Sequence, residues 1–213
     1  MTVSVFTEAV EGRGTVDVCF DDRSRIRIRK KDWIKHPLEA GEDIEIDRYE
    51  KLIFDSQMAE AYEAALSILD YSAKTESEIR KKLSMKGYLD SILDYVTERL
   101  KNARLIDDRM IAERIAEGAA ARGIGQYALK RKLRTRGITE DDTEYAMTLV
   151  DEEAEAEGAK KEAAKLFRKY ASLEKREARN KLSQALARRG YSWDAVTCAV
   201  EEVFSSDADF DDY

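Results

Sequence analysis

The stretches KKLSMKGY (residues 81–88), RKLRTRGI (131–138) and QALARRGY (184–191) are three versions of one pattern. Each has a leucine, two further residues, a basic residue, a glycine and an apolar residue. The anchors are Leu83/Gly87/Tyr88, Leu133/Gly137/Ile138 and Leu186/Gly190/Tyr191. Recurrence at intervals of about 50 residues indicates an array of repeats, each of them one supersecondary unit.

The chemistry within one copy predicts a helix, a turn and a second helix. Basic residues suit the negative end of a helix dipole, and a glycine that follows them can adopt the left-handed conformation that closes a helix. The apolar residue after the glycine can pack on the last turn. A capping residue then opens the next helix, namely Asp90, Thr139 or Ser192. The spacing leaves room for one more helix in front, so each repeat is predicted to hold three helices.

Composition limits the classes of protein that this chain can be. It has 213 residues, of which 38% are charged, and a single proline, which favours long helices. Neither Cys19 nor Cys198 has a metal-ligand neighbour, and His36 is the only histidine, so we expect no metal, no cofactor and two reduced thiols. The first residues do not resemble a signal peptide, and no apolar run is long enough to span a membrane. We therefore expect a soluble cytoplasmic protein.

The distribution of charge bears on possible partners. The net charge of −7 argues against strong nonspecific DNA binding. Local basic surfaces remain possible, and residues 154–204 carry 11 Lys and Arg against 8 Asp and Glu. Gly123 and Gly125 are predicted to form a turn between helices. They are not predicted to form a phosphate loop, because such a loop follows a strand and contains a lysine.

The first 46 residues have a different character. Val16, Val18 and Phe20 alternate with polar residues, as do Ile26 and Ile28, which predicts a β-hairpin around residues 21–24. Ile44 and Ile46 suggest a short third strand. The other face of the hairpin carries Arg25, Arg27 and Arg29. These arginines could contact an acidic partner, or they could form a solvated face partly neutralised by Asp17, which is the simpler interpretation.

Helix-start signals divide the remainder of the chain. Asp47 with Glu50, and Thr75 with Glu78, have the spacing of capping boxes. We predict a mainly α fold in which a small N-terminal β-hairpin segment precedes three three-helix repeats. The predicted parts are a hairpin plus helix (1–55), repeat one (56–108), repeat two (109–153), repeat three (154–204) and a disordered acidic tail (205–213).

The ordered set of motifs over residues 56–204 resembles the RecX family, bacterial regulators of the RecA recombinase. Repeat one has a tyrosine–alanine helix, a cap before Glu78, the leucine–basic–glycine turn and the closing run LIDD at 105–108. Repeat two adds Arg122, Gly123 and Gly125 ahead of its own turn. The sequence departs from the family in its long N-terminal segment and its acidic tail.

The resemblance implies a fold and a function. Members of this family form an elongated, curved tandem array of helical repeats. They bind RecA and lie in the groove of the RecA–single-stranded DNA filament. They inhibit its ATPase, strand-exchange and coprotease activities, and so modulate DNA repair, recombination and the SOS response. They are not enzymes. We therefore expect a RecA inhibitor that acts as a monomer, without a membrane partner.

Basic side chains that recur in each repeat are the candidate contact residues for RecA or for DNA. They are Lys81, Lys82, Lys86, Arg122, Lys130, Arg131, Arg134, Arg136, Arg188 and Arg189. Because most of them stand near the C-terminal ends of helices, they could equally be solvated residues matched to helix dipoles. The sequence leaves these two interpretations open.

Two other classes of function are possible. The basic stretch 126–136, with Tyr88, Tyr127 and Tyr191 as stacking platforms, would suit a protein that binds single-stranded DNA directly. The same tyrosines would suit helix packing, which we favour. An enzyme requires a nucleophile or a pair of titrating groups held close together. The carboxylates fall at helix caps and on outer faces, so we predict no catalytic site.

Overall fold

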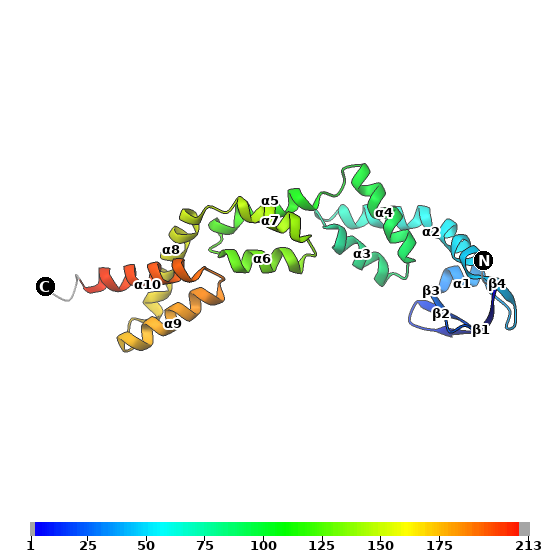
Figure 1. Cartoon of the computed structure of the whole chain (residues 1–213), viewed down its shortest axis with the longest axis horizontal. Helices are drawn as coiled ribbons and strands as arrows, with labels where there is room; N and C mark the ends of the chain where they lie inside the picture. The colour runs from blue at the N-terminus through cyan, green and yellow to red at the C-terminus, as the bar shows by residue number, and fades with distance from the viewer. Residues whose placement is uncertain (1–2, 209–213) are drawn as a thin grey trace. The chain divides into compact units, whose positions relative to one another are not determined.

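The computed structural model describes residues 3–208, with the exception of the side chains of residues 120–121 and 206–208 (Figure 1). It divides into two compact units, Met1–Asp107 and Asp108–Tyr213. The first contains four strands and four helices, and the second contains six helices among its described residues. The predicted fold class is confirmed in its parts, because three-helix repeats follow a small N-terminal β segment.

An antiparallel sheet begins the first unit. Its strands are β1 (Val3–Glu11), β2 (Thr15–Phe20), β3 (Arg25–Arg29) and β4 (Asp43–Glu45), in the order β3-β2-β1-β4. The predicted hairpin is β2 and β3, with Val16 opposite Ile28 and Val18 opposite Ile26. The predicted short strand is β4, which contains Ile44 but not Ile46, the first residue of the helix that follows. Strand β1 was not predicted, because a register shift between Phe6 and Glu8 interrupts the alternation of apolar and polar residues.

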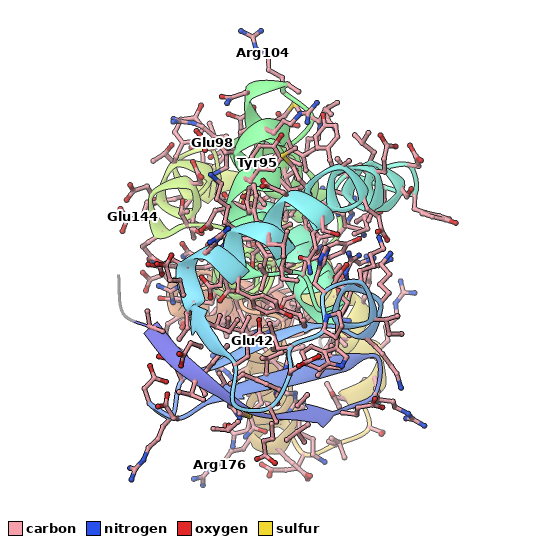
Figure 2. The ribbon with its side chains drawn as sticks, turned by 90° about the vertical axis from the view of Figure 1, so that its right-hand side faces the viewer. Glu42, Tyr95, Glu98, Arg104, Glu144 and Arg176 are labelled. Atoms are coloured by element: carbon pink, nitrogen blue, oxygen red, sulfur yellow. The ribbon has the colours of Figure 1, made fainter. Side chains whose placement is uncertain are left out.

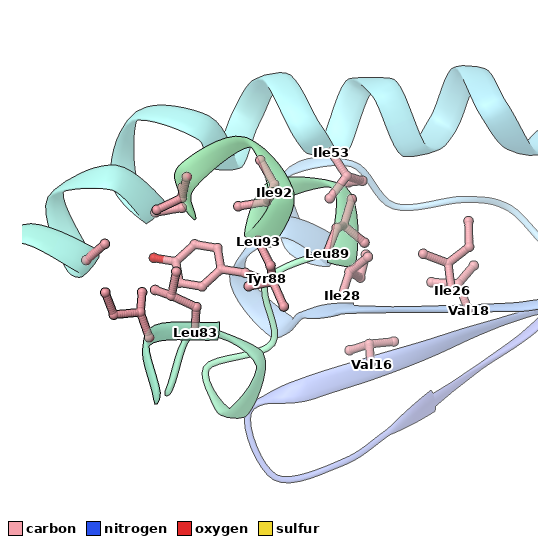
Figure 3. Close-up of a cluster of buried hydrophobic side chains, with 14 of the residues drawn as sticks. Val16, Val18, Ile26, Ile28, Ile53, Leu83, Tyr88, Leu89, Ile92 and Leu93 are labelled. Carbon is pink, nitrogen blue, oxygen red and sulfur yellow. The ribbon is translucent and has the colours of Figure 1, made fainter. Parts of the chain in front are cut away.

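Helices α1 (Lys30–Lys35), α2 (Ile46–Leu69), α3 (Glu76–Met85) and α4 (Asp90–Asn102) complete the first unit. The apolar face of the hairpin packs against α2 and against the turn between α3 and α4 (Figure 3). Val16, Val18 and Ile28 are fully buried there, as is Ile53 of α2. The sheet and repeat one therefore share a single core. Each fully buried aliphatic side chain in it contributes about 1.5–3 kcal/mol to the stability of the unit.

The second unit contains repeats two and three. Its helices are α5 (Asp108–Ala121), α6 (Gln126–Thr135), α7 (Glu140–Thr148), α8 (Glu152–Tyr170), α9 (Lys175–Arg188) and α10 (Trp193–Ala208). Helix α10 continues four residues into the segment that we expected to be a disordered tail, because Val203 and Phe204 still pack on the core of repeat three. Residues 209–213, the remainder of that predicted tail, lie outside the described residues.

Some of the predicted caps are correct and others are not. Thr75 and Glu78 form the capping box of α3, and the Thr139 hydroxyl accepts a hydrogen bond from the Asp142 N–H at the start of α7. Asp47 is not a cap, because β4 runs directly into α2 and Glu45 takes the N-cap position. Asp90 lies one residue inside α4 and is also not a cap.

The three leucine–glycine turns share one backbone geometry. The φ angles of Gly87, Gly137 and Gly190 are +82°, +73° and +83°. In each turn, the N–H of the residue after the glycine donates to the carbonyl of the anchor leucine. These bonds join Tyr88 to Leu83 (3.4 Å), Ile138 to Leu133 (3.2 Å) and Tyr191 to Leu186 (3.4 Å). Together with a shorter bond from each glycine N–H, they satisfy carbonyls that a helix end leaves unpaired.

A buried polar network attaches the first of these turns to the N-terminal sheet. The guanidinium of Arg29 donates to both carboxylate oxygens of Asp32, at 2.6 and 2.8 Å. Gln57 donates to Asp32 at 2.7 Å and accepts from the N–H of Leu89 at 3.1 Å. Asp32 and Gln57 are fully buried, and the Arg29 guanidinium lies over the Tyr88 ring, with Cζ 4.3 Å from the ring centroid. The network therefore joins β3, α1, α2 and the α3–α4 turn.

Close backbone contact attaches the third turn to repeat two. The N–H of Gly125 donates to the carbonyl of Arg189 at 3.1 Å, and the N–H of Tyr127 donates to that of Gly190 at 2.9 Å. A Cβ added to Gly125 would lie 2.2 Å from the backbone nitrogen of Tyr191. The predicted turn at Gly123 and Gly125 is therefore present, and Gly125 is required because another backbone occupies the space of a side chain.

A buried carboxylate reinforces that junction. Glu155 of α8 accepts from the N–H of Gln126 at 2.9 Å and from the N–H of Ser192 at 3.3 Å. These donors stand at the N-terminal ends of α6 and α10, where the helix dipoles favour negative charge. Glu155 is buried, so its partners are backbone groups that would otherwise lack an acceptor.

Among residues 3–208, no helix is both long enough and apolar enough to cross a membrane.

Candidate interaction surface

The ten basic residues singled out from the sequence fall into two groups. Lys81, Lys82 and Lys86 lie on α3 and at its C-cap in the first unit, where all three are exposed. The other seven belong to the second unit. Four are on α6 or at its C-cap, two are at the end of α9, and Arg122 follows α5.

Five cationic side chains of the second unit surround one open depression of about 560 Å³. They are Arg122, Arg131, Lys132, Arg136 and Arg189. The remaining lining residues include Ile124 and Ala128, which are apolar, and Gly123. Among the residues that the structure describes, none that lines this depression is acidic. We call it the basic depression.

Local structure explains why these cations meet. Arg122 lies in the turn after α5, and Arg136 and Arg189 are the C-caps of α6 and α9. Because the Gly190 turn docks on the first turn of α6, the C-terminal end of α9 is brought beside α6. Gly118 leaves space for Arg122, since a Cβ there would lie 3.3 Å from the Arg122 Cζ. Convergence of helix ends therefore concentrates positive charge.

One member of the depression is already paired with a carboxylate. Nη1 of Arg189 lies 2.6 Å from Oε2 of Glu162 on α8, and that carboxylate is also 3.0 Å from Nζ of Lys165. The Glu162 side chain is only 14% exposed. It occupies the edge of the depression beside Gly123, whose φ of +62° turns the chain between α5 and α6.

Lys130 and Arg134 lie on a neighbouring face of α6, outside the depression. Both contact Glu140, the first residue of α7, with Nζ of Lys130 at 3.1 Å and Nη2 of Arg134 at 2.8 Å from Oε1. Hydrogen bonds from Arg134 and Lys130 lower the pKa of Glu140 to about 2. Tyr127 is on the same face and is 63% exposed. Arg131 borders both this face and the depression.

Two of the three tyrosines considered as stacking platforms cannot serve as such. Tyr88 and Tyr191 are buried, because each packs back on its repeat immediately after the turn glycine. The preferred interpretation, helix packing, is therefore correct for both.

The arginines on the outer face of the hairpin have different environments. Arg27 forms an exposed ion pair with Asp17, as expected of a solvated face, whereas Arg29 is buried in the polar network.

Sequence reasoning missed part of the depression. Lys132 was not among the ten candidate residues, although it belongs to the same basic run of α6. Nothing in the sequence indicated that Ile124 and Ala128 line the depression, because single apolar residues near a turn are common. Arg188 was a candidate, but it is exposed outside the lining of the depression.

Over the described residues, no group of three or more His, Cys, Asp and Glu side chains could hold a metal ion. Cys19 is half-buried and Cys198 is exposed, and neither forms a disulfide.

Family models match two of the three repeats. Residues 61–100 match the model described as RecX, first three-helix domain. Residues 153–200 match the model described as RecX, third three-helix domain.

Whole-chain relatives carry the same description. A regulatory protein RecX from Clostridium acetobutylicum is 30% identical over 174 residues, which cover 80% of this chain and 81% of that protein. A regulatory protein RecX from Limosilactobacillus reuteri is 28% identical over 197 residues, covering 92% and 75% of the two chains.

Solved structures agree with these relatives. The crystal structure of a regulatory protein RecX has a TM-score of 0.63 and 27% identity, and the match covers 90% of this chain and 96% of that one. The crystal structure of RecX from Lactobacillus salivarius has a TM-score of 0.64 and 26% identity, covering 70% and 97%.

Proposed function

This chain belongs to the RecX family of regulatory proteins, and we propose from that premise that it is a negative regulator of RecA. In this proposal it binds RecA and the RecA filament on single-stranded DNA. It inhibits ATP hydrolysis, strand exchange and coprotease activity, and so modulates DNA repair and the SOS response. The observation that carries the proposal is the alignment with the Clostridium acetobutylicum protein over four-fifths of both chains.

The surface of the second unit supports action through binding. Cations from three helix ends converge on one depression, and two more lie on the adjacent face of α6. Clustered cations of this kind attract acidic surfaces and raise the rate of association with them. We propose that the protein acts by occupying a surface of the filament and not by catalysis, as a cytoplasmic monomer.

The experiment is a titration of this protein into RecA that is hydrolysing ATP on single-stranded DNA. The proposal predicts strong inhibition of ATP hydrolysis when this protein is present at a lower molar concentration than RecA. In parallel, binding of the protein to naked single-stranded DNA is measured at the same salt. Inhibition that appears only when the protein saturates the DNA, or no inhibition at all, would contradict the proposal.

A second candidate function, direct binding of single-stranded DNA, is favoured by one observation. Tyr127 is 63% exposed beside Lys130 and Arg131. In this arrangement a base of single-stranded DNA could stack on the tyrosine ring while the two cations contact the neighbouring phosphates. Two features weaken this candidate. Glu140 pairs with Lys130 and Arg134, and the chain carries a net charge of −7. Direct DNA binding would lose affinity steeply as salt rises.

A further inference from the structure

The basic depression combines two features that recognise different parts of one ligand. Its lining contains Arg122, Arg131 and Arg136, whose planar guanidinium groups match carboxylates and phosphates in a two-pronged geometry. The same lining includes Ile124 and Ala128, which offer an aliphatic surface. A ligand that satisfies both features carries negative charges next to an apolar group.

A carboxylate already contacts two of the lining residues. Glu162 reaches Arg189 at 2.6 Å, and its side-chain carbons lie so close to Gly123 that a Cβ there would be 3.1 Å from Cγ. An acidic side chain of this chain therefore lies beside the depression. It neutralises Arg189, one of the five cations of the lining, so its removal should strengthen the binding of an acidic ligand.

The apolar part of the lining distinguishes a peptide from a nucleic acid. Single-stranded nucleic acid is held by aromatic side chains on which bases stack, together with cations that follow the phosphates. Within the described part of the chain, no aromatic residue lines the depression. An acidic peptide with a leucine or phenylalanine among its carboxylates can bury that side chain on Ile124 and Ala128. The lining therefore favours a peptide.

We propose that the basic depression binds an acidic peptide segment of a partner protein, with an apolar side chain of the segment seated on Ile124 and Ala128. The carboxylates on either side of that residue pair with Arg122, Arg131 and Arg136. The proposal deepens the regulatory function and rests on it, because it names the chemistry by which the second unit holds its protein partner.

The test uses the full chain and a synthetic probe, the fluorescein-labelled hexapeptide EDLFDE, at about 100 mM salt so that distant charges are screened. Fluorescence anisotropy should give a dissociation constant of roughly 10–300 µM. Two matched peptides separate the two features. QNLFNQ lacks the carboxylates and EDAADE lacks the apolar anchor, and both should bind at least about fivefold more weakly.

Three variants locate the binding site. Arg131→Glu should weaken binding of EDLFDE by about tenfold or more, because a charged hydrogen bond becomes a repulsion. Lys175→Glu makes the same kind of change at an exposed residue of α9 outside the depression and should leave the affinity unchanged. Glu162→Gln should tighten binding by about two- to threefold, because it releases Arg189. An effect in the strengthening direction cannot arise from misfolding.

Three outcomes would overturn the proposal. The first is no binding of EDLFDE up to about 1 mM. The second is an equal loss of affinity in Arg131→Glu and Lys175→Glu. The third is binding of the oligonucleotide dT15, but not of the peptide, in a manner abolished by Arg131→Glu. Because no RecA is present, failure here is distinct from failure of the proposed regulatory function, which the ATPase titration tests.

Discussion

The turns at Gly87 and Gly190 have nearly the same backbone, yet they dock by opposite means. Side chains attach the Gly87 turn, since Gln57 accepts a hydrogen bond from the N–H of Leu89 and donates one to Asp32, which also binds Arg29. Backbone contact attaches the Gly190 turn, because its main chain lies directly against Gly125 and the first turn of α6, with no room for a side chain between them. The local pattern therefore specifies the turn, and a distant residue specifies its partner.

The third version, at Gly137, differs from both. Gly137 is exposed, whereas Gly87 and Gly190 are buried. Ion pairs that Glu140 forms with Arg134 and Lys130 connect the two helices on either side of this turn. The turn of repeat two is thus stabilised by contacts within the repeat. It follows directly after Arg136, which lines the basic depression.

The largest expected effect is loss of the polar network under the first turn. Replacing Asp32 by alanine leaves the buried Arg29 guanidinium with only the half-exposed carboxylate of Glu60, at 3.2 Å. Removing one partner of a buried ion pair costs about 3–5 kcal/mol, and Glu60 places this variant at the lower end of that range. The measurement is urea unfolding followed by tryptophan fluorescence in a Trp193→Phe background, so that the signal comes from Trp33, which packs on Phe6 in the same unit.

A double variant shows whether the unpaired charge is the cause. Arg29→Met/Asp32→Leu removes both charges and should recover part of the lost free energy of unfolding, because apolar residues of similar volume often replace a buried pair without loss. Recovery is incomplete, because the buried Gln57 amide still lacks its acceptor on Asp32. If Asp32→Ala costs less than about 1 kcal/mol, the side-chain docking of the first turn is wrong.

The second effect compares the buried and exposed glycines directly. Gly190→Ala should destabilise the second unit by about 3 kcal/mol, because its Cβ would lie 2.2 Å from the Ala128 nitrogen and the φ of +83° adds strain. Gly137→Ala carries only the strain of its φ of +73° and should cost about 1 kcal/mol. Urea unfolding followed by far-UV circular dichroism compares them, and equal losses would refute close backbone docking at Gly190.

A smaller effect is expected at a turn of the same form without glycine. Arg104, between α4 and α5, has φ of +55°, and the N–H of the next residue bonds to the Leu100 carbonyl at 2.9 Å. Its side chain points away from the ribbon (Figure 2). Arg104→Gly should therefore raise the free energy of unfolding by about 0.5–1 kcal/mol, because strain is relieved and no buried contact is lost. A decrease in thermal unfolding temperature would contradict this.

The smallest effect concerns the exposed turn and pH. Because Arg134 and Lys130 lower the pKa of Glu140 to about 2, its ion pairs stabilise the folded state fully above the ordinary glutamate value of 4.5. That contribution is lost as pH falls from there toward 2. The stabilisation is small because the groups are exposed. NMR titration of the Glu140 carboxyl checks this, and a pKa at or above 4.5 would show that these ion pairs do not form in solution.

The sequence predicted those features of the fold that depend on neighbours along the chain. The glycine turns, the Thr75 and Thr139 caps and the β2–β3 hairpin follow from residues close together, and all are present. Docking depends on distant residues and was not predicted. A signal did exist, because Gln57 interrupts the buried stripe of α2 between Ile53 and Ala61.

The candidate surface was predicted only in part, for a similar reason. The basic run of α6 was visible in the sequence, but its division into two faces was not. Arg131 and Lys132 line the depression, whereas Lys130 and Arg134 pair with Glu140. The meeting of Arg122 with Arg189 depends on the backbone contact at Gly125 and Gly190, which no local pattern encodes.

Inhibition of RecA ATP hydrolysis by an α6 charge-reversal variant tests the central claim most directly. The variant carries glutamate at Lys130, Arg131, Arg134 and Arg136, and its matched control carries glutamate at four exposed cations of the same unit, Lys161, Arg168, Lys175 and Arg176. Thermal unfolding confirms that both are folded. We predict that the α6 variant loses inhibition at least about tenfold while the control retains it. Intact inhibition by the α6 variant would show that this surface does not contact the filament.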